Sequence, residues 1–330
     1  MTTPYQFAHD AYAAQLQHTY SFLTDGEESG QSVRVAGRII LLRRQGKLAF
    51  ATMRDSSGEI QLFALDGVAE NFDAFSKLHL GDWVGVAGEV VRTKRGELSV
   101  KVAAWERLAE ALHNFGDKWA GIADFDLRYR HREADLWANE TSRRSLLRRS
   151  EVLRFVRERC WAAGFMEVET PILNPIPTGS AARPFVTHHH AFDSEFFLRV
   201  APELWLKRLV VGGFERVFEV GRVFRNEGVS PRHNPEFTML ELYQAYADYT
   251  DLMELTEQLV AHLASALLGT TVVTYDGREL DLSPPWRRAT LTDLVAEHTG
   301  AVLDLGTPIH QLRRVAQDHG IPVPAGWGPG

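Results

Sequence analysis

The stretch from residue 217 to residue 249 constrains the fold of this chain more than any other part. Residues 217–225 and 237–246 show alternation of apolar and polar side chains, and the polar segment NEGVSPRHNPE lies between them. Alternation with a period of two is typical of β-strands, whereas Gly, Ser-Pro and Asn-Pro favour turns. The stretch therefore predicts two antiparallel strands joined by a long polar loop.

The side chains of the second strand divide between two faces, because successive residues of a strand point in opposite directions. One face carries Phe237, Met239, Glu241 and Tyr243, and the other carries Thr238, Leu240, Leu242 and Gln244. The second set predicts contact with the core. The first set places a carboxylate on the same hairpin as Arg225. A half-buried carboxylate needs a partner, so either Glu and Arg pair in an ordinary hairpin, or this face binds a cationic ligand.

The strings FRNEG and RHNPEFTMLELYQAYADY in this stretch resemble motif 2 of the class II aminoacyl-tRNA synthetases, in the form found in lysyl-tRNA synthetases. Aspartyl and asparaginyl enzymes share the Arg-loop-Pro-Glu-Phe frame, but they do not usually continue as MLELYQAYADY. The resemblance implies a ligase that activates L-lysine with ATP to lysyl-adenylate and transfers the lysyl group to tRNA(Lys) in translation. The implied fold class is α+β: an N-terminal OB-fold β-barrel, then an incomplete antiparallel-sheet catalytic domain.

The same resemblance assigns the contacts with ATP. Arg225 would bridge the lysine carboxylate and the α-phosphate, and would stabilise the charge that develops there. Glu227 and Asn234 would hold the adenine amino group and nearby atoms. His233 would reach the phosphates, and Phe237 would stack on adenine.

Four further residues are implied to bind lysine together with Arg225. Glu241 and Tyr243 would receive the ε-ammonium group. Glu203, in the first turn of a helix predicted from RVAPELWLKRL, would hold the α-ammonium, although the helix dipole alone accounts for an acidic residue there. Gly179, in the small-residue loop IPTGSAARPF, would lie beside the amino acid.

Residues 31–110 predict a β-barrel. About five short strands are separated by turn signals at residues 55–58 and 94–96, and a helical patch at residues 71–78 lies between the third and fourth strands. This order fits an OB-fold, which binds single-stranded nucleic acid or sugar on one face. A small barrel that acts only as a spacer is the alternative.

The resemblance implies that this barrel binds the anticodon. OB-folds hold nucleic acid by stacking bases on aromatic rings beside a basic groove. Phe50 would stack on an anticodon base, while Arg43, Gln61 and Glu97 would contact base edges. Residues 33–107 and 128–159 contain more Lys and Arg than Asp and Glu, although the net charge of the chain is −7. This distribution is compatible with nucleic acid meeting the first half of the chain.

The chain is predicted to consist of four segments. These are an N-terminal helix and linker (1–30, with the helix over 4–23 and the linker over 26–32), the anticodon-binding domain (31–110), a connector (111–140) and the catalytic domain (141–330). The catalytic domain would open with a helix over residues 142–163, whose apolar stripe is Leu146, Leu147, Leu153, Phe155, Val156 and Trp161. This helix and the following GFMEVETPIL resemble motif 1, which implies a homodimer.

The last part of the chain predicts a helix over residues 251–268, a hairpin around residues 275–277 and a helix over residues 310–319. The family's motif 3, with its arginine for the γ-phosphate, and the acidic residues that hold Mg²⁺ with ATP are not found there. Metal ligands are therefore expected to be absent, and activity of this 330-residue form stays open. Two alternatives are an inactive synthetase fragment or tRNA/RNA-binding module, and a paralogue that modifies a protein lysine.

Several other classes of protein are disfavoured. A single cysteine, Cys160, excludes a disulfide framework or a Cys-based zinc site. Three consecutive histidines, residues 188–190, alternate between strand faces and disfavour one shared metal. Neither a secretory leader nor an apolar run of about 18 residues occurs, so we expect a cytoplasmic protein without membrane contact. Without a P-loop or Rossmann signature, ATP would have to be bound by the hairpin.

Overall fold

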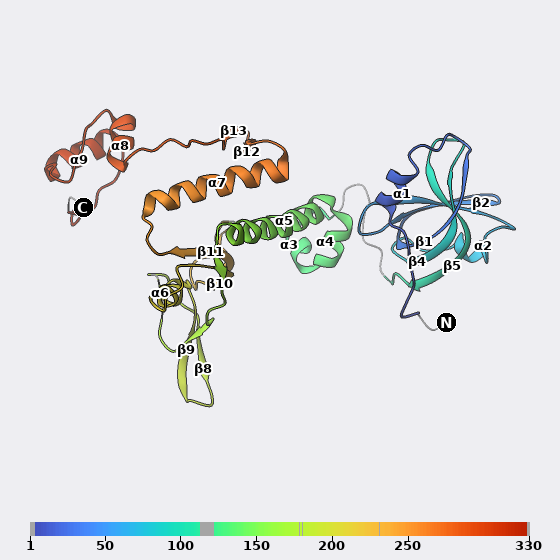
Figure 1. The fold of residues 1–330 in the computed structure, drawn as a ribbon, viewed down its shortest axis with the longest axis horizontal. Helices are drawn as coiled ribbons and strands as arrows, with labels where there is room; N and C mark the ends of the chain where they lie inside the picture. Colours follow the sequence, from blue (N-terminus) through green and yellow to red (C-terminus); the bar gives the residue numbers. More distant parts are fainter. Residues whose placement is uncertain (1–3, 113–121, 178, 180, 231, 329–330) are drawn as a thin grey trace. The chain divides into compact units, whose positions relative to one another are not determined.

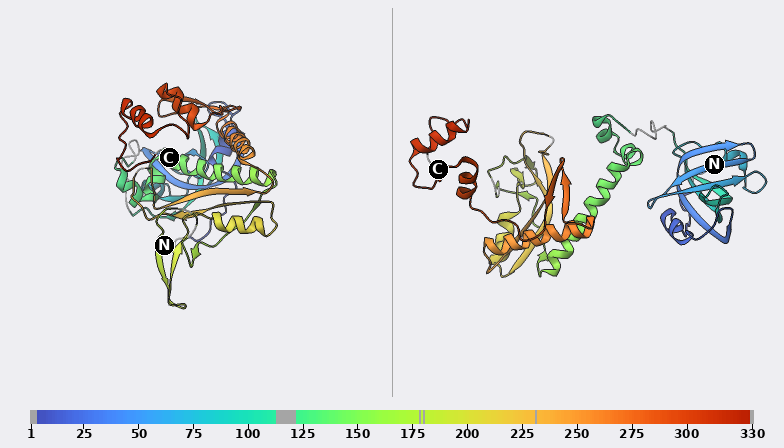
Figure 2. Two further views of the ribbon diagram at one scale, coloured as in Figure 1. Left: turned by 90° about the vertical axis from the view of Figure 1, so that its left-hand side faces the viewer. Right: turned by 90° about the horizontal axis from the view of Figure 1, so that it is seen from above.

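The computed structural model describes residues 4–112, 122–177, 179, 181–230 and 232–328. The chain divides into two compact units, Met1–Leu146 and Leu147–Gly330. Each unit contains its own cluster of buried apolar side chains. Figure 1 shows the helices and strands of both units, and Figure 2 shows them from two further sides.

The first unit is built on a closed barrel in the order β1-β2-β3-β5-β4 (Figure 1). Its elements are β1 (Glu28–Gln45), β2 (Leu48–Arg54), β3 (Glu59–Leu65), α2 (Phe72–Phe75), β4 (Trp83–Arg92) and β5 (Leu98–Ala109). Along β2 and β3 every second residue is buried, because the apolar side chains of a period-two pattern all point into a barrel. The predicted OB-fold barrel is confirmed, with its helix between the third and fourth strands.

The segment ahead of the barrel differs from the predicted helix over residues 4–23. Helix α1 spans only Ala13–Thr19, and β1 begins at Glu28, inside the predicted polar linker. The Asp10 N–H donates to Arg34 O at 3.0 Å, and the Arg34 N–H donates to Asp10 Oδ1 at 2.7 Å. These contacts with β1 satisfy polar groups that a longer helix would have used internally.

Gly88 lies where β4 passes between β1 and β5, opposite Val33 and Val102. A Cβ atom at Gly88 would lie 2.1 Å from the backbone oxygen of Lys101. Gly88→Ala is therefore expected to lower the free energy of unfolding by about 3 kcal/mol, measured by urea denaturation with tryptophan fluorescence. Gly58→Ala is the matched control, because its nearest neighbours would lie 3.9 Å away. Equal losses in both variants would contradict this account.

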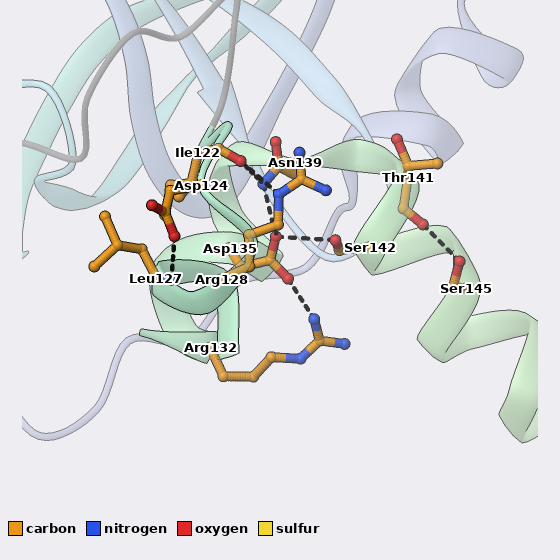
Figure 3. A network of polar contacts seen from close by, with 10 residues as sticks. All are labelled: Ile122, Asp124, Leu127, Arg128, Arg132, Asp135, Asn139, Thr141, Ser142 and Ser145. Carbon is orange, nitrogen blue, oxygen red and sulfur yellow. Dashed lines mark hydrogen bonds and ion pairs between the residues drawn. The ribbon is translucent and has the colours of Figure 1, made fainter. Parts of the chain in front are cut away.

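A short helical connector follows the barrel within the first unit. It contains α3 (Phe125–Arg130), α4 (Arg132–Ala138) and the start of α5 (Glu140–Ala162). At its centre the buried Asp135 carboxylate accepts hydrogen bonds from Asn139 Nδ2 at 2.6 Å and Ser142 Oγ at 2.9 Å, and pairs with Arg132 (Figure 3). Burial raises the pKa of Asp135, but these hydrogen bonds and the charges of Arg132 and Arg128 outweigh burial and hold the pKa below its usual value. One carboxylate thus joins α4 to the first turn of α5.

The second unit is built on a sheet in the order β11-β10-β6. Its strands are β6 (Met166–Glu167), β10 (Arg216–Phe224) and β11 (Glu236–Gln244), and α5 and α7 (Tyr249–Leu268) pack against one face of it (Figures 1 and 2). The core between helices and sheet contains Cys160, Phe165 and Phe218, with Leu240 and Leu242 packed against them. This confirms which face of the second hairpin strand was predicted to meet the core.

Helix α5 and the predicted helix over residues 142–163 agree to within two residues at each end. The helix ends before Gly164, which has a φ of +82°. Glycine adopts this conformation at little cost and is common after the end of a helix. Only part of the predicted apolar stripe is used within the unit. Val156 packs against the core, whereas Leu146, Leu147 and Trp161 are exposed.

The second unit also contains strands and helices outside this sheet. They are β7 (Leu173–Asn174), β8 (Val186–His189), β9 (Ser194–Leu198), α6 (Glu203–Val211), β12 (Val272–Tyr275), β13 (Arg278–Asp281), α8 (Leu291–Thr299) and α9 (Ile309–Asp318). The predicted hairpin around residues 275–277 is confirmed as β12 and β13. The helices predicted over residues 251–268 and 310–319 are confirmed as α7 and α9, whereas α8 was not predicted. Among the described residues, no helix is both long enough and apolar enough to cross a membrane.

Candidate functional site

The pairing of β10 with β11 determines which side chains of the candidate site lie opposite each other. The strands pair antiparallel from Arg216 opposite Gln244 to Phe224 opposite Glu236, and the Arg225 N–H donates to Pro235 O at 2.8 Å. The predicted hairpin is therefore confirmed, although the second strand ends two residues earlier than expected. Tyr246 has a φ of +58°, which takes it out of the strand.

Directly opposite residues share a face of the sheet, so the register places Glu219 beside Glu241 on the face away from α5 and α7. Tyr243 lies on that face too, and its hydroxyl donates to Glu241 Oε2 at 3.3 Å. Glu219 is buried and pairs with Arg199, whose Nη1 lies 2.5 Å from Glu219 Oε1. Among the described residues, Glu241 has no cationic partner.

The surroundings of Glu241 disfavour its charged form. Burial raises the pKa of Glu241 above its usual value. The hydrogen bond from Tyr243 and the charge of Arg199 act against this, whereas the charges of Glu203 and Glu219 add to it. Burial and the Glu241 charge also raise the pKa of Tyr243, which stays a neutral donor. The ordinary-hairpin alternative, in which Glu241 pairs with Arg225, is not what the structure contains.

Arg225 lies at the end of β10 against the ring of Phe237. Its guanidinium carbon is 5.2 Å from the ring centroid, a distance at which cation–π attraction is effective. Within the described part of the chain, Arg225 Nε is buried and has no hydrogen-bond partner. A buried donor without an acceptor is costly, which suits an arginine that binds an anion.

A groove of about 580 Å³ lies at the residues that directly follow Arg225 in the chain. It is lined by Ala181, Arg183, Asn226, Glu227 and Gly228. The Asn226 N–H donates to Arg183 O at 2.8 Å, which connects the small-residue loop that precedes β8 with the residues that follow β10. Sequence reasoning placed Glu227 here but missed Arg183, a cation within that small-residue loop.

Gly179 and Glu203, both assigned to lysine by the resemblance, lie close to each other in the structure. Gly179 has a φ of +82°, and a Cβ atom there would lie 3.3 Å from Ala201 Cβ and 3.8 Å from Glu203 Cβ. Glu203 begins α6, and its Oε1 lies 2.5 Å from Lys207 Nζ one turn later. A Cβ atom at position 179 would therefore be in tight contact with Ala201, and the positive φ favours glycine there.

His233 and Asn234 lie in the loop between β10 and β11. His233 Nδ1 is 2.8 Å from Ser230 Oγ, and His233 and Ser230 also form a backbone bridge. Neither His233 nor Asn234 lines the groove that contains Glu227. Their assignment to ATP stays a prediction.

The barrel carries a second candidate site. A groove of about 480 Å³ is lined by all four residues predicted to contact the anticodon, Arg43, Phe50, Gln61 and Glu97. Phe50 stacks on Phe63 of the neighbouring strand, with ring centroids 5.1 Å apart. Further cations at the rim are Arg92, Lys94 and Arg95. An aromatic platform beside clustered cations suits single-stranded nucleic acid.

The described residues do not contain a cluster of potential metal ligands. In the part of the chain that the structure describes, His, Cys, Asp and Glu side chains form no group of three or more that could hold a metal ion. In the histidine run, His188 Nε2 lies 3.3 Å from Asp193 Oδ1, and the His189 ring stacks on Phe192 at 4.5 Å.

Comparison with known proteins adds to this geometry. Residues 33–108 match the family "OB-fold nucleic acid binding domain", and residues 124–319 match "tRNA synthetases class II (D, K and N)". The chain is 46% identical to a lysine–tRNA ligase of Clostridium perfringens (strain 13 / Type A) over 319 residues, which are 96% of this chain and 64% of the relative. It is 52% identical to a lysine–tRNA ligase of Synechococcus sp. (strain CC9605) over 293 residues, 87% of this chain and 58% of the relative.

The match with the first of these relatives covers 64% of its length, so the chain spans somewhat less than two thirds of it. The synthetase family alone covers residues 124–319, which is more than half of the chain. The chain therefore belongs to the class II tRNA synthetases of the D, K and N group.

Proposed function

We propose that this chain carries out the chemistry of a lysine–tRNA ligase: it activates L-lysine with ATP and transfers the lysyl group to tRNA(Lys). The main support is Glu241, a half-buried carboxylate that has a tyrosine hydroxyl but no cationic partner among the described residues. A ligand with an ammonium group would supply the missing charge. A neutral side chain would leave the carboxylate unpaired, and this gives selectivity.

The proposed reaction needs no covalent protein nucleophile. A carboxylate oxygen of lysine attacks the α-phosphorus of ATP, an acyl–phosphate bond forms, and pyrophosphate leaves with the electrons of the broken P–O bond. Arg225 would donate hydrogen bonds to the lysine carboxylate and to the α-phosphate, where negative charge develops. The remaining work is positioning: Phe237 for adenine, Glu227 and Asn234 for its amino group and nearby atoms, and His233 for the phosphates.

Magnesium accompanies ATP in class II synthetases generally. The described residues do not offer it a cluster of ligands, so we assign no residue to the ion. The steps proposed here depend only on side chains that the structure describes.

The lysine pocket would be completed by the small-residue loop that contains Gly179 and by the first residue of α6. Glu203 would bind the α-ammonium, and Gly179 would let the amino acid approach the backbone closely. Support comes from the contact between these two positions and from the influence of the Glu203 charge on Glu241.

We further propose that the barrel groove binds the anticodon of tRNA(Lys), with Phe50 stacked on a base. Phe50→Ala is expected to weaken tRNA(Lys) binding by about 10-fold, because one base–aromatic stack contributes about 1–3 kcal/mol. The salt dependence should stay unchanged, whereas Arg43→Ala should reduce its slope. Filter binding at several salt concentrations measures both. Phe22→Ala is the control, since Phe22 is an exposed aromatic residue of the same unit outside the groove; a similar loss there would contradict the assignment.

A homodimer in the cytoplasm is the proposed setting. The exposed apolar side chains Leu146, Leu147 and Trp161 of α5 support an interface between two copies. They belong to the segment that resembles motif 1.

Lysine-dependent exchange of pyrophosphate into ATP tests the proposed function directly. The purified chain is expected to exchange with lysine and much less with arginine or ornithine, because the pocket must match both charge and length. Failure to exchange, in a chain that is folded and still binds tRNA(Lys), would reject the ligase proposal for this chain and favour a nucleic-acid-binding module.

A further inference from the structure

A buried ion pair lies next to the proposed lysine pocket and has no role in the chemistry above. Arg199 and Glu219 are only 2% and 4% exposed. Arg199 Nη1 donates to Glu219 Oε1 at 2.5 Å and to Thr170 Oγ1 at 2.9 Å, and the Thr170 hydroxyl donates to Glu219 Oε2 at 2.6 Å. Arg199 Nε donates to Arg222 O at 2.8 Å. Both carboxylate oxygens of Glu219 are therefore satisfied by this network.

The backbone of β10 makes room for the Arg199 guanidinium. A Cβ atom on Gly221 would lie 2.2 Å from Arg199 Nη2 and 3.0 Å from Glu219 Oε1. The guanidinium thus lies against the glycine on the same face of the sheet as Glu219 and Glu241, which are directly opposite each other. Two like charges at opposite positions of neighbouring strands repel each other, unless one of them is neutralised.

We propose that Arg199 is a positioning residue for substrate selection: by neutralising Glu219 it leaves Glu241 as the uncompensated negative charge that receives the substrate's side-chain ammonium. This inference rests on the proposed function, because it takes Glu241 to be the ammonium ligand. Arg199 itself does not touch the substrate. It controls the charge state of Glu241, and hence which side chains the pocket accepts.

All charged and titratable groups around Glu241 enter this balance. Tyr243 is on the same strand, Glu219 is on β10, Arg199 follows β9, and Glu203 on α6 is itself paired with Lys207. Without Arg199, the Glu219 charge would act unscreened on Glu241 and favour its protonated form. Without Glu219, the Arg199 charge would compete with the substrate ammonium for Glu241 and favour the ionised form. The two losses therefore have opposite pH signatures.

The test measures the affinity of the full chain for lysine between pH 6 and 8.5 by isothermal titration calorimetry, with norleucine as the uncharged control ligand. In Arg199→Met, the pH at which affinity rises is expected to move up by about one pH unit, with about 10-fold weaker binding at low pH that recovers at high pH. In Glu219→Gln the rise should move down, with weaker binding that high pH does not restore. The double variant should bind within about threefold of the unaltered chain.

Each outcome decides one question. If Arg199→Met does not fold, Glu219→Gln and the double variant still carry the test, because the double variant holds no unpaired buried charge. A uniform loss of affinity with an unchanged pH profile, or a double variant no better than the single ones, would overturn the role of Arg199. If the unaltered chain discriminates poorly between lysine and norleucine, the proposed function fails instead.

Discussion

Replacing Arg225 by alanine is expected to lower the rate of lysine-dependent ATP–pyrophosphate exchange by about 1,000-fold, the upper end of the effect that follows removal of a donor aimed at developing charge. Arg225 lies against Phe237, and its Nε is buried without a partner among the described residues. The contact with the Phe237 ring therefore positions the side chain before any ligand binds. A group positioned in advance stabilises the transition state without reorganising during the reaction.

Two matched variants separate this role from general loss of charge or structure. Arg225→Lys should remain impaired by about 100-fold, because an ammonium group cannot reproduce the planar, bidentate donors of a guanidinium. Arg222→Ala should change the rate by less than about threefold, because surface substitutions away from the site have small effects; Arg222 is exposed and lies on the same strand, opposite Thr238 rather than Phe237. Exchange that survives in Arg225→Ala would remove this residue from the mechanism.

The parts of the fold that sequence predicts well are those in which local pattern and tertiary packing agree. The barrel strands combine alternating burial with turn-forming residues at their ends. The two-residue period and the turn residues therefore indicate the same strand boundaries. The same is true of β12 and β13, which are joined by Asp276 and Gly277, both with positive φ. The β10–β11 hairpin was also predictable, because its loop is rich in turn residues and its inward face is apolar.

Other features depend on partners that are distant in sequence. Residues ahead of α1 were expected to be helical, but Asp10 instead pairs with the backbone of β1. Arg199 and Glu219 are 20 residues apart, and nothing in either local segment indicates that they meet inside the protein. Arg183 joins the groove beside Glu227 only through a loop contact. Local propensity carries no information about such pairings, which are set by how the strands and loops pack.

The candidate lysine site shows the same division. That Glu241 and Tyr243 share a face follows from the two-residue period of a strand. That Glu241 lacks a cationic partner among the described residues does not follow from sequence, because Arg225 was an equally available candidate for pairing. The structure resolves this: Arg225 contacts Phe237, Arg199 pairs with Glu219, and Glu241 is left with Tyr243.

Glu241→Gln is expected to lower kcat/KM for lysine by about 1,000-fold in the exchange reaction, because a carboxylate in a half-buried site binds an ammonium group much more strongly than an amide does. Burial raises the pKa of Glu241, so in the unaltered chain kcat/KM should rise with pH as this carboxyl ionises. The variant should lose that part of the pH profile, since glutamine does not titrate. Tyr243→Phe is the milder comparison and should keep the pH-dependent rise while losing about 10-fold, the contribution of one hydrogen bond to a charged group.

The melting temperature of Glu241→Gln provides an independent test of the role of this carboxylate. Glu241 lies opposite Glu219 and near Glu203, so its charge is disfavoured in the folded protein unless a cation is bound. Removing that charge should not lower the melting temperature at pH 8, and added lysine should raise the melting temperature of the unaltered chain more than that of the variant. A variant that unfolds more easily would mean that Glu241 stabilises the fold. A variant that is more stable but no longer responds to lysine would identify the carboxylate as a group kept for binding at a cost in folding free energy.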